Sequence, residues 1–513
     1  MFLKRSVFLL LVCLVFTGCS SGSNSNDNPP VDLQTADGGQ ELTPADTEST
    51  DLDPGLDQVA ETTVDGLDDP DLTPPDVKPD VPWQPPFDPT VCGAAPHTWL
   101  PPDGMGEVVL FEELMFSNLE PQITDEMLDE AGYGFFGKAK YTVRNFRMRY
   151  VTQDRGQKIE ATAIVGIPVG EDVPWPAPTL VWLHGTSGFM DECAPSTDPL
   201  LGPIPTTLWA AQGYVTVAPD YIGLVGFGDP SPPGNIHPYL VAEATAIGSL
   251  ASIRALFNAL DENQDLGQYD SQQVVLVGGS QGGHAAFFTE RYWPHYSPEF
   301  DIIAVAAAVP PMDLRGQAQN AVSGIVDGSG NLLATIVGMK QWYGIPEDLS
   351  AVFTDQEPLF IASVVEEEMA GSCHPDVDLD AITKITDAYL PSFVTAVTDE
   401  NWEVVQPWEC FLTQNSIPGT SVPKASDVPY LTPYAELDTL VVTAVEKKQW
   451  LKNCEQGYRM EYLECAGLGH SKGALSSLAY VRVWLAARLA GEPWDEDKIC
   501  VMTEPVDCLE LVK

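Results

Sequence analysis

The sequence predicts an α/β fold, with a mostly parallel sheet, helices on both faces and an inserted helical cap. From about residue 91 onward, strand-like and helix-like segments alternate, which is typical of α/β domains. Several strand-like segments are unbroken apolar runs, as parallel strands buried on both faces require. One gap of about 115 residues between two such strands holds only helical patches, and a structureless loop of that length is rare inside a compact domain. We therefore expect an insertion in this gap.

Two kinds of strand are expected. Residues 141–152 and 158–169 alternate polar and apolar side chains, which predicts an antiparallel pair at a sheet edge. Buried parallel strands are expected at residues 179–183, 214–218, 273–277, 302–309, 428–434 and 459–465. Helices are expected at residues 241–260, 284–292, 443–456 and 472–490.

The insertion divides the folded part of the chain in two. It is expected to cover residues 313–427, after the strand at 302–309. The first part of the core then covers residues 91–312, and the second part, with a C-terminal tail, covers residues 428–513.

The first 19 residues have the layout of a secretory signal. Two basic residues precede an unbroken apolar run at 7–16, and small residues stand directly before Cys19. The run is too short to span a bilayer, which needs about 20 residues. The layout resembles a bacterial lipoprotein signal, which implies a signal peptide at residues 1–18 and a lipid on Cys19. An ordinary signal peptide cut near this position is the alternative.

Residues 19–90 form an acidic segment rich in proline and threonine. Residues 20–90 hold 17 acidic side chains and one basic side chain, Lys78, with neither helical nor strand periodicity. Such a composition cannot bury enough apolar area to offset the entropy lost on ordering, so we expect a solvated tether. Residues 91–513 carry 57 acidic and 22 basic side chains, a net charge of −35. Nucleic acid is thereby excluded as a partner, and an uncharged substrate is favoured.

The chain has ten cysteines. One leaves with the signal peptide and Cys19 is assigned to lipid, so eight remain, an even number that predicts disulfides in an exported protein. Their short loops favour the pairs Cys454 with Cys465 and Cys500 with Cys508. No C-x-x-C spacing occurs, so we expect neither a zinc cluster nor a redox dithiol. No cofactor is expected.

A candidate nucleophile lies in the segment 274–284, whose sequence is Val-Val-Leu-Val-Gly-Gly-Ser-Gln-Gly-Gly-His. It contains the pattern Gly-x-Ser-x-Gly centred on Ser280, between an apolar strand and a helix-compatible segment. A serine on a strained strand-to-helix turn exposes its hydroxyl, and the flanking glycines let backbones approach closely. We expect Ser280 to be a nucleophile; a merely tight glycine-rich turn is the alternative.

A serine hydroxyl needs a neighbouring imidazole to act as a nucleophile near pH 7, and the imidazole needs a carboxylate to orient it. In this architecture both groups follow the serine in the chain. His470 is favoured because it ends a loop that leaves the last predicted strand; a helix-capping or core histidine is the alternative. Of the other downstream histidines, His284 lies on the helix after the serine, His295 follows that helix and His374 falls in the insertion.

Two acidic residues compete for the orienting role. Asp438 follows the carboxyl end of the strand at 428–434 and precedes His470 by 32 positions. Glu436 lies two residues nearer the strand, where its side chain is expected to point into the sheet. Asp438 is therefore favoured.

The loop after the strand at 179–183 is expected to supply part of an oxyanion hole. It has the sequence His184-Gly-Thr-Ser-Gly. Backbone N–H groups of Gln281 and of Gly185 or Thr186 would stabilise a tetrahedral oxyanion. His184 itself is alternatively a hydrogen-bonding residue at the strand end.

Together these motifs resemble the α/β-hydrolase superfamily and, within it, the secretory lipase group. The resemblance covers about residues 95–492 and rests on His184-Gly-Thr, Cys193-Ala-Pro-Ser196, Pro219-Asp-Tyr-Ile-Gly223, Gly279-Ser-Gln-Gly-Gly283, Glu436-Leu-Asp438 and Gly467-Leu-Gly-His470. It implies the α/β-hydrolase fold, ester hydrolysis through an acyl-enzyme, no metal and a cap over an acyl pocket. It also implies a triad of Ser280, Asp438 and His470. In one departure from the group, Ala435 stands where glycine is usual.

Three functions follow from these features. The favoured function is a serine carboxylic-ester hydrolase of lipase or esterase type, acting on a small-molecule or lipid ester. A peptidase with the same triad is the second. The third is a surface lipoprotein that uses the fold only for binding, which the filled triad positions disfavour. The expected location is outside the cytoplasm, on the outer membrane or cell surface, through a lipid anchor.

Overall fold

The computed structural model describes residues 83–115, 117–232, 234–346, 348–357, 360–373 and 382–512. The predicted signal peptide, Cys19, the tether as far as residue 82 and His374 lie outside these residues. No helix in the described part of the chain is long and apolar enough to cross a membrane.

One sheet of nine strands organises the described residues, in the order β1-β2-β3-β5-β4-β6-β7-β8-β9. Strands β4 to β9 are parallel to one another, and β1, β2 and β3 are antiparallel to their neighbours. The mostly parallel sheet is therefore confirmed. The strands are β1 (Val108–Glu113), β2 (Thr142–Asp154), β3 (Gln157–Val169), β4 (Ala177–Leu183), β5 (Val215–Pro219), β6 (Tyr269–Gly279), β7 (Ile302–Ala308), β8 (Pro429–Ala435) and β9 (Arg459–Cys465).

The predicted antiparallel pair is β2 and β3, which pair along their whole length from Thr142 and Val169 to Asp154 and Gln157. The pair does not form the sheet edge as expected, because β1 pairs with the outer side of β2. Strand β1 was not predicted, since its sequence Val-Val-Leu-Phe-Glu-Glu lacks regular alternation.

Helices cover both faces of the sheet. Alternate residues of a strand point to opposite faces, so a continuously apolar strand presents apolar side chains to the helices on both sides. In β4, Val181 and Leu183 pack with one hydrophobic cluster, whereas Leu180 and Trp182 pack with another. The first cluster includes residues of α4 (Ala242–Glu262), α5 (Gln281–Tyr296) and α11 (Thr443–Glu455). The second includes residues of α2 (Pro121–Glu130), α3 (Ile204–Ala210) and α12 (His470–Leu489).

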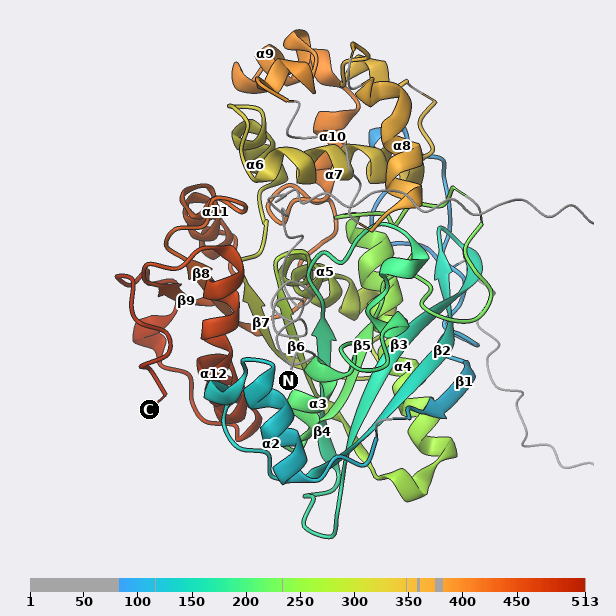
Figure 1. Cartoon of the computed structure of the whole chain (residues 1–513), viewed down its shortest axis with the longest axis vertical. Coiled ribbons are helices and arrows are strands. Elements are labelled where there is room, and N and C mark those ends of the chain that lie inside the picture. The colour runs from blue at the N-terminus through green and yellow to red at the C-terminus, as the bar shows by residue number, and fades with distance from the viewer. Residues whose placement is uncertain are drawn as a thin grey trace, which may run out of the picture. The chain divides into compact units, whose positions relative to one another are not determined.

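The chain between β7 and β8 forms a group of helices with a hydrophobic core largely its own. Figure 1 shows these helices, in yellow to orange, gathered beyond one end of the sheet. We refer to residues 313–427 as the insertion. Its helices are α6 (Leu314–Ala321), α7 (Gly328–Tyr343), α8 (Ile361–Gly371), α9 (Pro391–Thr398) and α10 (Trp408–Gln414).

Four disulfides join described residues, and both predicted pairs are wrong. The observed pairs are Cys92–Cys410, Cys193–Cys373, Cys454–Cys500 and Cys465–Cys508.

The direction of the C-terminal segment explains the pairing. Cys454 lies near the start of β9 and Cys465 at its end, and a strand of seven residues separates its two ends by about 20 Å. The C-terminal segment runs beside β9, with bridges from Glu461 to Ile499 and from Cys465 to Val506. Each end of β9 therefore meets one cysteine of that segment.

Candidate active site

Ser280 lies on a strained turn between β6 and α5. Its φ of 57° and ψ of −122° are unfavourable for a residue with a side chain. Its N–H donates to the carbonyl of Ala308 on the neighbouring strand at 2.9 Å. A Cβ at Gly278 would lie 2.1 Å from the Gly282 oxygen, and a Cβ at Gly282 would lie 1.9 Å from the Leu183 oxygen. The glycines of the motif are thus required by close backbone contacts.

His470 places its imidazole between Ser280 and Asp438. Its Nε2 lies 2.8 Å from the Ser280 Oγ, and its Nδ1 lies 2.7 Å from the Asp438 Oδ2. Because an ionised carboxylate only accepts hydrogen bonds, Nδ1 carries the hydrogen, and Nε2 is free to accept from the serine hydroxyl. His470 is the first residue of α12 and follows the loop that leaves β9.

Asp438 is fixed by the backbone of its own turn. Its Oδ1 accepts from the N–H groups of Leu440 at 3.0 Å and Val441 at 2.9 Å, which leaves Oδ2 for the imidazole. Glu436 does not point into the sheet as expected. It is exposed and accepts from the N–H of Gly467 at 2.7 Å.

The other described histidines downstream of the serine are held elsewhere. The Nε2 of His284 lies 2.8 Å from the carbonyl oxygen of Asn415, and burial lowers the pKa of His284 to about 4. The Nε2 of His295 lies 3.0 Å from the carbonyl oxygen of Pro423.

The loop after β4 packs against the first turn of α5. A Cβ at Gly282 would lie only 2.7 Å from the His184 oxygen, in addition to its close approach to Leu183. The predicted donors Gly185 and Thr186 follow directly in the chain, and Gln281 opens α5. The two segments expected to form an oxyanion hole are therefore neighbours.

His184 itself is a hydrogen-bonding residue at the strand end. Its Nδ1 lies 2.6 Å from the backbone carbonyl oxygen of Gly185, and its Nε2 lies 3.3 Å from the backbone carbonyl oxygen of Asp220. Burial lowers the pKa of His184 to about 4, so the ring is neutral near pH 7.

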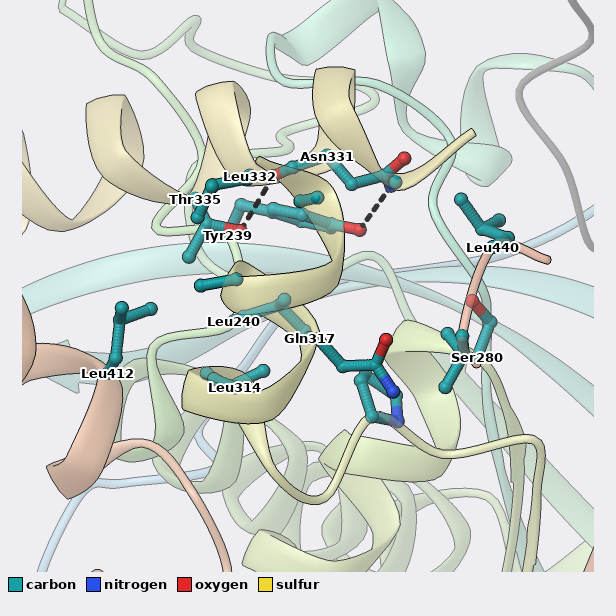
Figure 2. Close-up of a pocket in the computed structure, with 15 residues that line it drawn as sticks. Tyr239, Leu240, Ser280, Leu314, Gln317, Asn331, Leu332, Thr335, Leu412 and Leu440 are labelled. Atoms are coloured by element: carbon teal, nitrogen blue, oxygen red, sulfur yellow. Dashed lines mark hydrogen bonds between the residues drawn. The ribbon is translucent and has the colours of Figure 1, made fainter. Parts of the chain in front are cut away.

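Ser280 lies in the wall of a mostly apolar pocket that encloses about 510 Å³, including its open mouth. Figure 2 shows Ser280 and Leu440 on one side of this pocket and Leu412 on the other. The insertion supplies much of the lining through α6, α7 and α10. Lining residues that the sequence did not reveal include Tyr239, Leu240, Leu314, Gln317, Asn331, Leu332, Thr335 and Leu412.

Solved structures identify the class of fold. The structure is similar to the rice cell wall degrading esterase LipA from Xanthomonas oryzae, with a TM-score of 0.60, 24% identity, and coverage of 76% of this chain and 100% of that one. It is also similar to Candida antarctica lipase A in its closed state, with a TM-score of 0.58, 16% identity, and coverage of 82% and 87%. A putative hydrolase from Legionella pneumophila has a TM-score of 0.61 at 16% identity and coverage of 76% and 100%. These likenesses establish the α/β-hydrolase fold.

The sequence identifies the family. The model of the secretory lipase family matches residues 206–497, more than half of the chain, and the protein belongs to this family. It is therefore a carboxylic-ester hydrolase of the lipase and esterase type. No curated protein matches the sequence. The family and the four disulfides both indicate an exported protein.

Proposed function

We propose that the protein hydrolyses carboxylic esters by a serine mechanism, with Ser280, His470 and Asp438 as the catalytic triad. One observation carries the proposal: a continuous hydrogen-bonded chain joins the three side chains at the wall of an apolar pocket. All three are more than nine-tenths buried, so water competes little for their hydrogen bonds.

The first half-reaction forms an acyl-enzyme. The Ser280 oxygen attacks the ester carbonyl while its proton passes to the Nε2 of His470. Asp438 stabilises the imidazolium through the Nδ1 hydrogen bond. The tetrahedral oxyanion accepts hydrogen bonds from the backbone N–H of Gln281 and from that of Gly185 or Thr186. Its collapse breaks the ester C–O bond, and His470 returns the proton to the leaving alkoxide, which departs as the alcohol.

The second half-reaction restores the serine. Water gives a proton to the Nε2 of His470 and attacks the acyl carbonyl, which forms a second tetrahedral intermediate. Its collapse breaks the bond to the Ser280 oxygen, His470 returns its proton to that oxygen, and the carboxylic acid leaves. With the ester and one water molecule, the triad and the backbone donors account for every bond and proton in the two half-reactions.

We assign the apolar pocket to the acyl chain and the insertion to a cap that covers it. The lining leucines come from both the insertion and the sheet side, so an acyl chain placed there is enclosed by apolar side chains. Burial of each methylene contributes about 0.8 kcal/mol. We therefore expect kcat/KM for p-nitrophenyl esters to rise about fourfold for each added methylene until the pocket is filled.

Replacement of the nucleophile tests the mechanism. We expect Ser280→Ala to abolish turnover of p-nitrophenyl esters and to leave the melting temperature near that of the unchanged protein. Ser477→Ala is the matched control, because Ser477 is also buried but donates to the Ala474 carbonyl within α12. Retained turnover in Ser280→Ala would contradict the mechanism, and faster cleavage of p-nitroanilides than of esters would favour a peptidase.

We also propose a lipid on Cys19, which lies outside the described residues. The proposal rests on the signal layout before Cys19 and on the exported character of the family. Expression with radioactive palmitate in a bacterial host is expected to label the protein, and Cys19→Ser is expected to remove the label. Equal labelling of both proteins would contradict this anchor.

A further inference from the structure

A buried turn at residues 237–240 connects several parts of the proposed site. The N–H of Tyr239 donates to the His237 carbonyl at 2.7 Å, and the N–H of Val241 donates to the Pro238 carbonyl at 3.0 Å. Leu240 has a φ of 55°, a left-handed conformation that costs roughly 1–3 kcal/mol in a residue with a side chain. Such strain persists only where surrounding contacts hold it, and the side chains of this turn supply several.

His237 holds the residue after the nucleophile. Its Nε2 lies 2.7 Å from the side-chain nitrogen of Gln281, and its Nδ1 lies 2.7 Å from the Ile222 oxygen. Because the Gln281 amide nitrogen can only donate, Nε2 is the acceptor and Nδ1–H donates to Ile222. Burial lowers the pKa of His237 to about 4, which keeps the ring in this neutral form near pH 7.

Tyr239 holds the opposite side of the proposed oxyanion hole. Its hydroxyl lies 2.9 Å from the Thr186 Oγ1 and accepts from the Asn331 side chain at 3.0 Å. Figure 2 shows the second of these bonds, between the turn and α7 at the pocket wall. With Asn331 as donor, the Tyr239 hydroxyl hydrogen is available to Thr186.

A third aromatic residue, Tyr221, contacts both His184 in the loop after β4 and His237 in the turn. Tyr221 stacks on His184 with ring centroids 4.2 Å apart and on His237 with centroids 5.8 Å apart. Its hydroxyl donates to the His184 carbonyl at 2.9 Å. Tyr221 also has a positive φ, 71°, within the Pro219-Asp-Tyr-Ile-Gly223 motif.

Helix α7 of the insertion packs tightly on the same turn. A Cβ at Gly338 would lie 2.9 Å from the Tyr239 nitrogen and 3.2 Å from the His237 oxygen. Together with the Asn331 bond, this contact fixes the turn against the insertion.

We propose that His237 and Tyr239 are positioning residues that set the distance between the two halves of the oxyanion hole, His237 through Gln281 and Tyr239 through Thr186. The inference rests on the proposed serine mechanism and deepens it. One rigid turn, supported by α7, holds both donor segments, so the oxyanion hole is complete only when the insertion is packed against the turn.

Double-mutant cycles with p-nitrophenyl butyrate as substrate test whether Tyr239 acts through Thr186 and His237 through Gln281. Tyr239→Phe and Thr186→Val are each expected to lower kcat about 10- to 100-fold with KM changed less than twofold, since loss of a whole oxyanion donor costs about 10²–10³-fold. If Tyr239 acts through Thr186, the double variant loses no more than the worse single variant. Gln281→Met removes the side-chain amide and keeps the backbone N–H. The losses in kcat of His237→Phe and Gln281→Met are expected to be non-additive in the same way.

Tyr296→Phe is the matched control. Tyr296 is also fully buried, and its hydroxyl accepts from the amide of Gln153 at 2.9 Å, but it lies at the far end of α5 from Ser280. We expect its kcat to remain within twofold of that of the unchanged protein. A trifluoromethyl ketone, which mimics the tetrahedral intermediate, is expected to lose affinity in the Tyr239→Phe protein in proportion to kcat/KM.

Three results would overturn the inference: an unchanged kcat in Tyr239→Phe, a loss confined to KM, or losses that multiply in the double variants. Thermal melting verifies that each variant is folded, and Thr186→Val provides the test alone if Tyr239→Phe does not fold. Failure of the proposed serine mechanism would give a different result from failure of this inference. In that case Ser280→Ala would keep its activity, or the unchanged protein would have no activity.

Discussion

In an Asp438→Asn variant, the side chain would keep its place and present a donor to His470 in place of an acceptor. The N–H groups of Leu440 and Val441 donate to the Oδ1 of Asp438 at 3.0 and 2.9 Å. They would hold the asparagine oxygen at that position and turn its NH₂ group toward the Nδ1 of His470. The imidazole would then carry its hydrogen on Nε2 and could not accept the proton of Ser280.

The expected loss in kcat is about 10⁴-fold, the value measured for the same change in a serine protease, and equals about 5 kcal/mol of transition-state stabilisation. KM should change little, because Asp438 does not line the described pocket. The hydrogen bonds to the turn are retained, so the melting temperature should also change little. Steady-state kinetics with p-nitrophenyl butyrate and thermal unfolding measure both quantities.

Glu436→Gln is the control for the neighbouring acid. Glu436 accepts from the N–H of Gly467 at 2.7 Å, and glutamine preserves an acceptor there, so kcat should stay within twofold. A loss smaller than tenfold in Asp438→Asn, or a larger loss in Glu436→Gln, would refute the assignment of the acid.

Two further changes probe stability. Burial raises the pKa of Glu290 to about 7, from an ordinary value of 4.5, so the folded protein keeps this proton where the unfolded chain loses it. The stability that this carboxyl contributes is full below about pH 4.5 and is lost as the pH rises to about 7, by about 3 kcal/mol. The free energy of unfolding of Glu290→Gln, measured with denaturant, should therefore fall between pH 5 and pH 8 by roughly 2–3 kcal/mol less than that of the unchanged protein; an equal fall in both proteins would contradict this. Gly282→Ala places a Cβ 1.9 Å from the Leu183 oxygen and should lower stability by at least about 3 kcal/mol in the same assay, whereas a change below about 1 kcal/mol would show that the turn can adapt.

The sheet could be predicted because its buried strands are continuous apolar runs. The strand expected at residues 459–465 is β9, and the strand expected at 302–309 is β7, one residue shorter. Strand β1 could not be found in this way. Its register follows from pairing with β2, which is a tertiary contact with no local signal.

The disulfides show the limit of local reasoning. Short loops favoured Cys454 with Cys465, but an extended strand lies between these residues and holds them apart. The observed partners depend on the direction of the C-terminal segment beside β9, which no spacing of cysteines reveals.

The residues of the candidate site also fall into two groups: those that a local sequence pattern indicates, and those that only the fold brings together. Ser280 stands in a local motif and His470 after a predictable strand, so both positions could be chosen from the sequence. The partners of the 237–240 turn could not, since His237 contacts Gln281 44 positions away and Tyr239 contacts Asn331 92 positions away.

Covalent labelling tests the central claim most directly. The protein is incubated with an alkyl fluorophosphonate, digested and analysed by mass spectrometry to find the modified residue. We expect a single phosphonyl group on Ser280, formed in the unchanged protein and not in Ser280→Ala. A label on another residue, or equal labelling of the Ser280→Ala protein, would contradict it.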